Sequence, residues 1–91
     1  MATMYKKGNL EIITTSSFEI ETEVGSNEMR NAKGVLINQA FDHNPHLGNS
    51  YFIETPTAEE AKKLGKLLVD EAKAGGNIWD AVPEGYKVDE L

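Results

Sequence analysis

The chain has 91 residues, a formal net charge of -6 at pH 7 and no cysteine, and 40% of its residues are hydrophobic. This length predicts a single domain over residues 1–91, without room for a second core. The lack of cysteine excludes disulfides, zinc–thiolate sites and thiol catalysis. An acidic balance without clustered Lys and Arg argues against nucleic-acid binding.

Hydrophobicity is spread in short segments along the chain. No apolar run approaches the roughly 18 residues that a membrane span needs. Residues 1–9 lack the apolar region of a secretory signal. We therefore expect no membrane association and a cytoplasmic location.

Two strands are predicted in the first part of the chain. Residues 10–13 are apolar and strand-like, and in residues 18–24 apolar or β-branched side chains alternate with Glu19, Glu21 and Glu23. Such alternation is typical of a strand with one dry face and one solvated, acidic face. The intervening Thr-Thr-Ser-Ser segment at 14–17 is interpreted as a turn, so the two strands are expected to form a hairpin.

The next segment, residues 26–41, admits two interpretations. Ser26 can cap a short helical turn over residues 27–33 that Gly34 stops, followed by a strand over 35–41. Alternatively, residues 27–42 form one longer helix, because apolar side chains recur there at helical spacing. We favour the strand, since Gly34 inside a helix would cost about 1 kcal/mol relative to alanine and residues 35 and 37 are β-branched.

Residues 42–50 are rich in turn-forming residues and are predicted to be a loop. Residues 51–54 are predicted to be a short strand, which Pro56 ends.

A helix over residues 58–74 is the best-specified element. Thr57 is a suitable N-cap, Glu60 completes a capping box, and Gly75 and Gly76 mark the end. One narrow stripe of the helix is apolar or small, and it consists of Ala61, Leu64, Gly65, Leu68 and Ala72. Gly65 at the centre of this stripe suits a helix that lies close against a sheet. After it, residues 77–91 are predicted to be an irregular tail with a turn at 83–85.

Together these elements predict an α+β fold. We expect a small, mostly antiparallel sheet of three or four strands, with the helix packed on one face.

Possible chemistry is concentrated in the segment that contains both histidines. Asp42, His43 and His46 could form a binding site for a small molecule, because imidazole and carboxylate groups bind ligands and exchange protons. Their spacing matches no metal signature, and a polar turn is the more ordinary interpretation. We expect no metal site, no cofactor and no catalytic residues, since no nucleophile–base pair or glycine-rich phosphate loop is present.

The apolar content predicts more than one covered face. One helix covers one side of a small sheet, but Ile13, Leu36 and Ala40 are expected to point to the other. Either the tail wraps over that second face, or the face meets a partner or another copy of the chain.

We therefore predict a non-enzymatic binding protein that acts through a protein interface, as an inhibitor, adaptor or assembly factor, for example of a phage, and that self-associates. Leu67, Trp79 and Tyr86 are candidate interface residues, although Trp79 could equally fill the core. The alternatives are a small-molecule binder or minor enzyme at the histidine loop, and an acidic mimic of a nucleic-acid surface.

Overall fold

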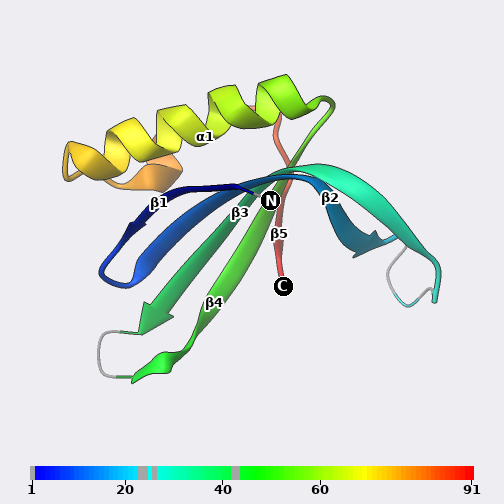
Figure 1. Ribbon diagram of the computed structural model, residues 1–91, viewed down its shortest axis with the longest axis horizontal. Helices are drawn as coiled ribbons and strands as arrows, with labels where there is room; N and C mark the ends of the chain where they lie inside the picture. Colours follow the sequence, from blue (N-terminus) through cyan, green and yellow to red (C-terminus); the bar gives the residue numbers. More distant parts are fainter. Residues whose placement is uncertain (1, 23–24, 26, 42–43) are drawn as a thin grey trace.

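The computed structural model describes residues 2–22, 25, 27–41 and 44–91. It contains a five-stranded antiparallel sheet, with strand order β1-β2-β3-β4-β5, and one α-helix packed on it (Figure 1). The elements are β1 (Ala2–Lys7), β2 (Leu10–Glu21), β3 (Met29–Phe41), β4 (Asn44–Thr55), the helix α1 (Ala58–Lys73), a short 3-10 helix η1 (Ile78–Ala81) and β5 (Val88–Glu90). The α+β class is confirmed, but the sheet has five strands rather than three or four, because β1 and β5 add an edge strand on each side.

Strand β2 is continuous through the segment predicted to be a turn. Thr15 pairs with Gly34 and Phe18 with Ala32, so β2 holds one extra residue between these pairs, a β-bulge. The Ser17 amide donates to the Thr15 hydroxyl at 3.3 Å. The predicted turn was wrong because Ser and Thr side chains that hydrogen-bond to nearby backbone occur in bulges as well as in turns.

Strand β3 replaces the helical turn predicted over residues 27–33. Its Met29–Phe41 segment pairs with β2 on one side and β4 on the other. The strand predicted over 35–41 is confirmed, and the longer helix is excluded. Gly34 does not end a helix. It allows the backbones of β3 and β4 to approach closely, since a Cβ at position 34 would lie 2.1 Å from the Ile53 carbonyl oxygen.

Strand β4 begins at Asn44, so the loop predicted over residues 42–50 was wrong within the described residues. The turn-forming residues have roles in the sheet. Gly48 lies flush against β3, where a Cβ would approach the Gln39 carbonyl oxygen to 2.2 Å. The Ser50 hydroxyl donates to Asn38 Oδ1 at 2.7 Å. The strand predicted over residues 51–54 lies inside β4.

The predicted helix and its cap are confirmed. The Glu60 amide donates to Thr57 Oγ1 at 3.1 Å, and Gly75 follows the helix with φ of 81°. The buried residues of α1 are Ala61, Leu64, Gly65, Leu68 and Val69. Gly65 faces β1 and β2, because a Cβ there would lie 2.4 Å from the Met4 sulfur and 3.0 Å from Thr14 Cγ2.

The main core lies between α1 and the sheet. Its buried members are Ile12, Val35, Ile37, Ile53, Leu64, Leu68, Val69 and Ile78. Trp79, Val82 and Tyr86 pack against this same cluster. The apolar part of the tail therefore covers the helix side of the sheet and leaves the second face to other elements.

The second face is the concave side of an arch. In Figure 1, β2 and β3 rise beneath α1 and then descend on the far side, so the sheet curves away from the helix. A smaller cluster lies on this face, with Ala32, Leu36 and Phe52 buried and Ile13, Phe18 and Ile20 half-buried around them. The Phe18 and Phe52 rings stack with centroids 4.7 Å apart, although β3 separates their strands. Gly34 permits this contact because it places no side chain between the rings.

Candidate functional site

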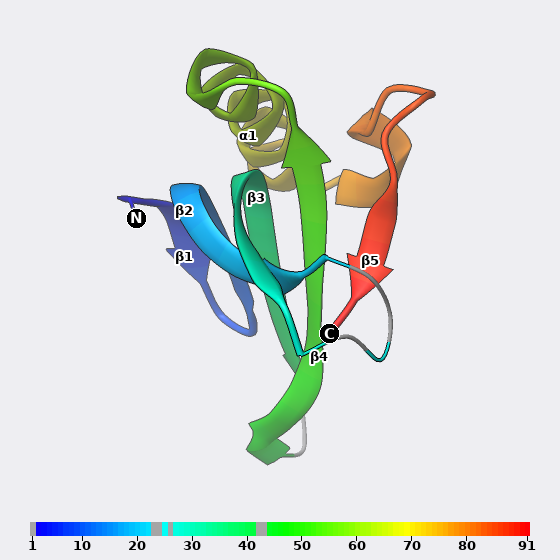
Figure 2. The ribbon, with the colours of Figure 1, turned by 90° about the vertical axis from the view of Figure 1, so that its right-hand side faces the viewer.

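A large cavity lies on the concave side, between the curled ends of β2 and β3 and the edge formed by β4 and β5. It is a cleft of about 550 Å³, a volume within the range of ligand-binding sites. Figure 2 shows the end of β2 passing in front of β4 towards the side of the molecule that carries β5. We call this cavity the cleft, and its lining consists of Phe18, Glu19, Ile20, Glu21, Thr22, Met29, Arg30, Glu54, Lys87, Asp89, Glu90 and Leu91.

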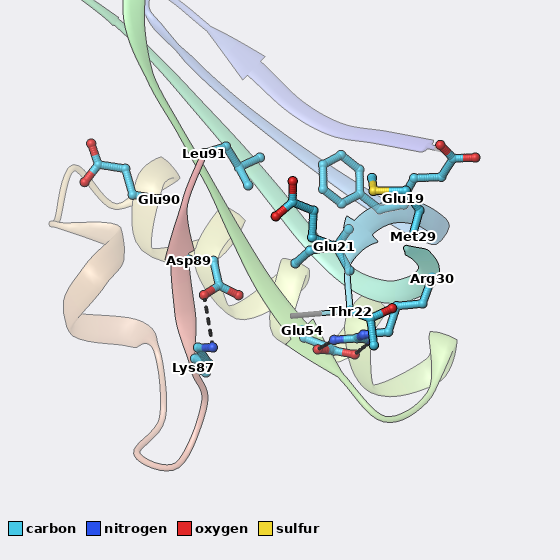
Figure 3. Close-up of a pocket in the computed structure, with 12 residues that line it drawn as sticks. Glu19, Glu21, Thr22, Met29, Arg30, Glu54, Lys87, Asp89, Glu90 and Leu91 are labelled. Carbon is cyan, nitrogen blue, oxygen red and sulfur yellow. Dashed lines mark hydrogen bonds and ion pairs between the residues drawn. The ribbon is translucent and has the colours of Figure 1, made fainter. Parts of the chain in front are cut away.

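A bidentate ion pair links β3 to β4 at one end of the cleft. Arg30 Nη1 lies 2.6 Å from Glu54 Oε2, and Arg30 Nη2 lies 2.7 Å from Glu54 Oε1 (Figure 3). The hydrogen bonds from Arg30 lower the pKa of Glu54 despite the opposing effect of partial burial. The two side chains are 41% and 36% exposed, so solvent screens this pair and its main contribution is to hold β3 and β4 in register.

The second basic group of the cleft is also paired. Lys87 Nζ lies 3.4 Å from Asp89 Oδ1 on the β5 side. Among the described residues, the lining therefore contains five carboxylates and two basic groups, and both basic groups are already in ion pairs. Three carboxylates are in excess, which makes the cleft attractive to a positively charged group.

The carboxylate side chains that are not in ion pairs point in different directions. In Figure 3, Glu21 points across the opening towards Leu91, whereas Glu19 and Glu90 extend outwards from opposite margins. The Gly25 amide donates to Glu21 Oε2 at 3.3 Å, which orients this side chain. The negative charge thus lies both in the opening and around its rim.

Exposed apolar side chains lie beside these charges. Met29 is 53% exposed and Leu91 57% exposed, and Phe18 and Ile20 are half-buried. Exposed apolar surface with a polar rim is typical of a surface that binds another molecule.

The other end of the concave face is polar, and its side chains hydrogen-bond to one another. Asn38 Nδ2 donates to Glu11 Oε1 at 2.9 Å, and Ser50 donates to Asn38 Oδ1 at 2.7 Å. These bonds run across β2, β3 and β4. Because the three side chains bind one another, the cleft is the more receptive half of the face.

The structure does not describe the side chains of the predicted ligand-binding residues. Asp42 and His43 are outside the described residues, and His46 is described only as backbone in β4. Among the residues that the structure describes, no group of three or more His, Asp or Glu side chains is arranged to hold a metal ion. Ligand binding by this segment remains an untested prediction, and His43→Ala and His46→Ala are the variants that test it.

The three candidate interface residues lie on the convex side. Leu67 is 49% exposed on the outer surface of α1. Trp79 packs against the main core and makes an edge-to-face contact with Tyr51, with centroids 5.0 Å apart. Tyr86 also packs on this core, and its pKa is raised by loss of solvation and then by the charge of Glu60 and a hydrogen bond with it. Trp79 and Tyr86 thus contribute to the core, and only Leu67 is freely exposed.

Sequence reasoning missed most of the cleft. The alternating carboxylates of β2 were visible, with a basic partner as one interpretation of them. Arg30 and Glu54 gave no signal, because they are single charges that only the strand register brings together.

Comparisons with protein-family models, curated proteins and solved structures give no match to this chain. In the part of the chain that the structure describes, α1 and η1 fall short of the length and apolar character needed to cross a bilayer.

Proposed function

We propose that this chain is a non-enzymatic binding protein that acts through a protein interface, and that the cleft is its binding surface. The observation that supports this function is the cleft's combination of exposed apolar side chains with three carboxylates in excess of its ion pairs. A partner with apolar side chains and positive charge would bury Met29 and Leu91 while neutralising that excess.

The chemistry of the lining suits binding better than catalysis. The lining residues that the structure describes include no His, Cys or Ser, and the guanidinium among them, that of Arg30, is held in an ion pair. A nucleophile with an adjacent base is the usual requirement for covalent catalysis. A protein that acts by occupying a partner's surface needs no reacting group, only a complementary binding surface.

A photo-cross-linking amino acid placed at position 29 tests this function in the cells that produce the protein. Leu47 is the matched control position, because its side chain is 56% exposed, close to the 53% of Met29, and lies outside the cleft lining. The proposal predicts discrete protein adducts from position 29 and none from position 47. Absence of adducts at position 29, or the same adducts from both positions, would contradict it.

A further inference from the structure

The last part of β2 has one side without a neighbouring strand. β1 pairs with β2 only as far as Thr14, and residues 18–21 pair only with β3, in the part of the chain that the structure describes. Residues 18–22 all line the cleft. Because successive side chains of a strand point to opposite faces, a consecutive run of lining residues means that the strand borders the cleft with its edge. We call this part of β2, residues 18–21, the open edge.

The strand register shows which backbone groups of the open edge are available. The Thr22 amide donates to the Glu28 carbonyl oxygen at 2.9 Å, so these two residues form a hydrogen-bonded pair of the β2–β3 ladder. In an antiparallel ladder such pairs alternate with pairs whose N–H and C=O groups point outwards. Glu19 and Glu21 therefore direct their backbone N–H and C=O groups away from β3, where no described strand pairs with them.

Strand β5 presents a second open side across the cleft. The Leu91 amide donates to the Ser50 carbonyl oxygen at 2.8 Å, so by the same alternation the backbone groups of Val88 and Glu90 point away from β4. Residues 89–91 line the cleft, and the end of β2 passes towards β5 in Figure 2. The cleft is thus a gap between two strand edges, which is the position that a further strand would occupy.

The side chains of the open edge specify the kind of strand that fits. Phe18 and Ile20 belong to the apolar cluster of the concave face, so Glu19 and Glu21 lie on the opposite face of β2. Residues directly opposite each other in paired strands share a face and interact. A strand added here meets apolar and acidic side chains in alternation, and it matches them with apolar residues at every second position and lysine or arginine between them.

We propose that the cleft binds an extended segment of a partner protein, with alternating apolar and basic residues, as an additional strand antiparallel to the open edge. This inference rests on the proposed function of the cleft and specifies the partner. A second copy joined through the same edge is disfavoured, because it would bring the glutamates of both copies together. Glu19 and Glu21 also keep the open edge from pairing with strands that lack positive charge.

Amide hydrogen exchange in the presence of a synthetic peptide tests this mode of binding. The probe is a peptide of about seven residues, a usual strand length, in which valine and lysine alternate. Without peptide, the Glu19 and Glu21 amides should exchange quickly, whereas the Ile20 amide, which points to β3, should already be protected. Peptide at concentrations up to the order of 1 mM should slow exchange at Glu19 and Glu21 about tenfold or more.

Matched peptides separate strand pairing from charge, with affinity measured by fluorescence anisotropy. A peptide of the same composition with its valines and lysines grouped should bind about tenfold or more weakly. In an antiparallel pair, the residues opposite Glu19 and Glu21 direct their amides at β2, and these are the lysines. N-methyl groups on the lysine amides should therefore weaken binding more than N-methyl groups on the valine amides.

A variant of the chain tests the charge of the open edge. Glu19→Gln/Glu21→Gln should weaken binding of the alternating peptide about threefold or more, because two opposite-charge pairs are lost. Gln at position 21 keeps an acceptor for the Gly25 amide. Asp80→Asn/Glu84→Gln is the matched control, since it removes two exposed charges outside the cleft lining and should bind the peptide like the wild type. Circular dichroism checks that both variants are folded.

Several results would overturn the inference. Unchanged exchange of the Glu19 and Glu21 amides at the highest peptide concentration, equal binding of the grouped peptide, or equal binding of the two N-methylated peptides would each exclude strand addition at the open edge. A control variant that loses as much affinity as the test variant would reduce the effect to net charge. If the alternating peptide fails to bind while cross-linking at position 29 still captures another protein, the proposed function stands and this inference fails.

Discussion

Gly34 is the residue on which the concave face most depends. Its neighbours leave no space for a side chain, since a Cβ would lie 2.1 Å from the Ile53 carbonyl oxygen and 2.9 Å from Phe52 Cζ. The backbone oxygen cannot move without disturbing the β3–β4 ladder. The stacking of Phe18 on Phe52 depends on the same space.

Gly34→Ala is therefore expected to lower the free energy of unfolding by about 1–3 kcal/mol, the usual cost of overpacking. Gly76→Ala is the control, because the Cβ there would meet only the flexible side chain of Glu71, and we expect a change within about 0.5 kcal/mol. Urea denaturation measures both. A Gly34→Ala protein as stable as the wild type would contradict the close contact between Gly34 of β3 and Ile53 of β4.

The Arg30–Glu54 pair gives a pH dependence of known sign. The pKa of Glu54 is lowered in the folded state by its hydrogen bonds from Arg30. Its contribution to stability is thus present above the unfolded-state pKa, near 4.5, and is lost as the pH falls through the folded-state value.

We expect Arg30→Met to flatten the decline in stability over this acidic range relative to the wild type. Thermal melting between about pH 6 and pH 3 measures the two slopes. Lys33→Met is the control, since Lys33 is exposed and outside the cleft lining. Equal slopes for the wild type and Arg30→Met would contradict a role for the pair.

At the scale of elements, η1 is a cover for the main core. Ile78 is only 3% exposed, and Trp79 contacts Tyr51 of β4 edge to face. The Asn77 side chain caps this short helix by accepting from the Trp79 amide at 3.1 Å. The segment after α1 is therefore held on the helix side of the sheet.

Trp79→Ala is expected to cost about 2 kcal/mol of stability, less than the loss for a fully buried tryptophan because the side chain keeps some exposure. It should not weaken cross-linking of a partner at position 29 under conditions where the protein is folded, since Trp79 is not among the residues that line the cleft. Chemical denaturation and the cross-linking yield separate the two effects. A loss of cross-linking without a loss of stability would instead make Trp79 an interface anchor.

The helix was predictable from sequence, whereas much of the sheet was not. Thr57, Glu60 and Gly75 act locally, so residues 57–75 carry their own start and stop signals. Strands depend on partners distant in the chain. The Ser and Thr residues at 14–17 and the Asn, Gly and Ser residues at 48–50 are typical of turns, and pairing with neighbouring strands, β3 above all, keeps them in strands.

The site was less predictable than the fold for the same reason. The cleft combines residues from β2, β3, β4 and the C-terminal segment, and its ion pairs follow from strand register. Sequence patterns indicated an acidic strand and an exposed Leu67, but not that one lies on the concave side and the other on the convex side. The curvature of the sheet, which separates these two sides, is not visible in the sequence.

At the scale of the whole molecule, the arch has the main core and α1 on its convex side and the cleft on its concave side. Binding of a positively charged partner in the cleft should weaken as ionic strength rises from about 0.1 M to about 1 M, because the Debye length falls from about 10 Å to about 3 Å.

Cross-linking from position 29, with position 47 as the matched control, tests the proposed binding surface most directly, because it reports contact at the cleft itself. We predict discrete protein adducts from position 29 and none from position 47. Absence of adducts at position 29, or the same adducts from both positions, would contradict the account.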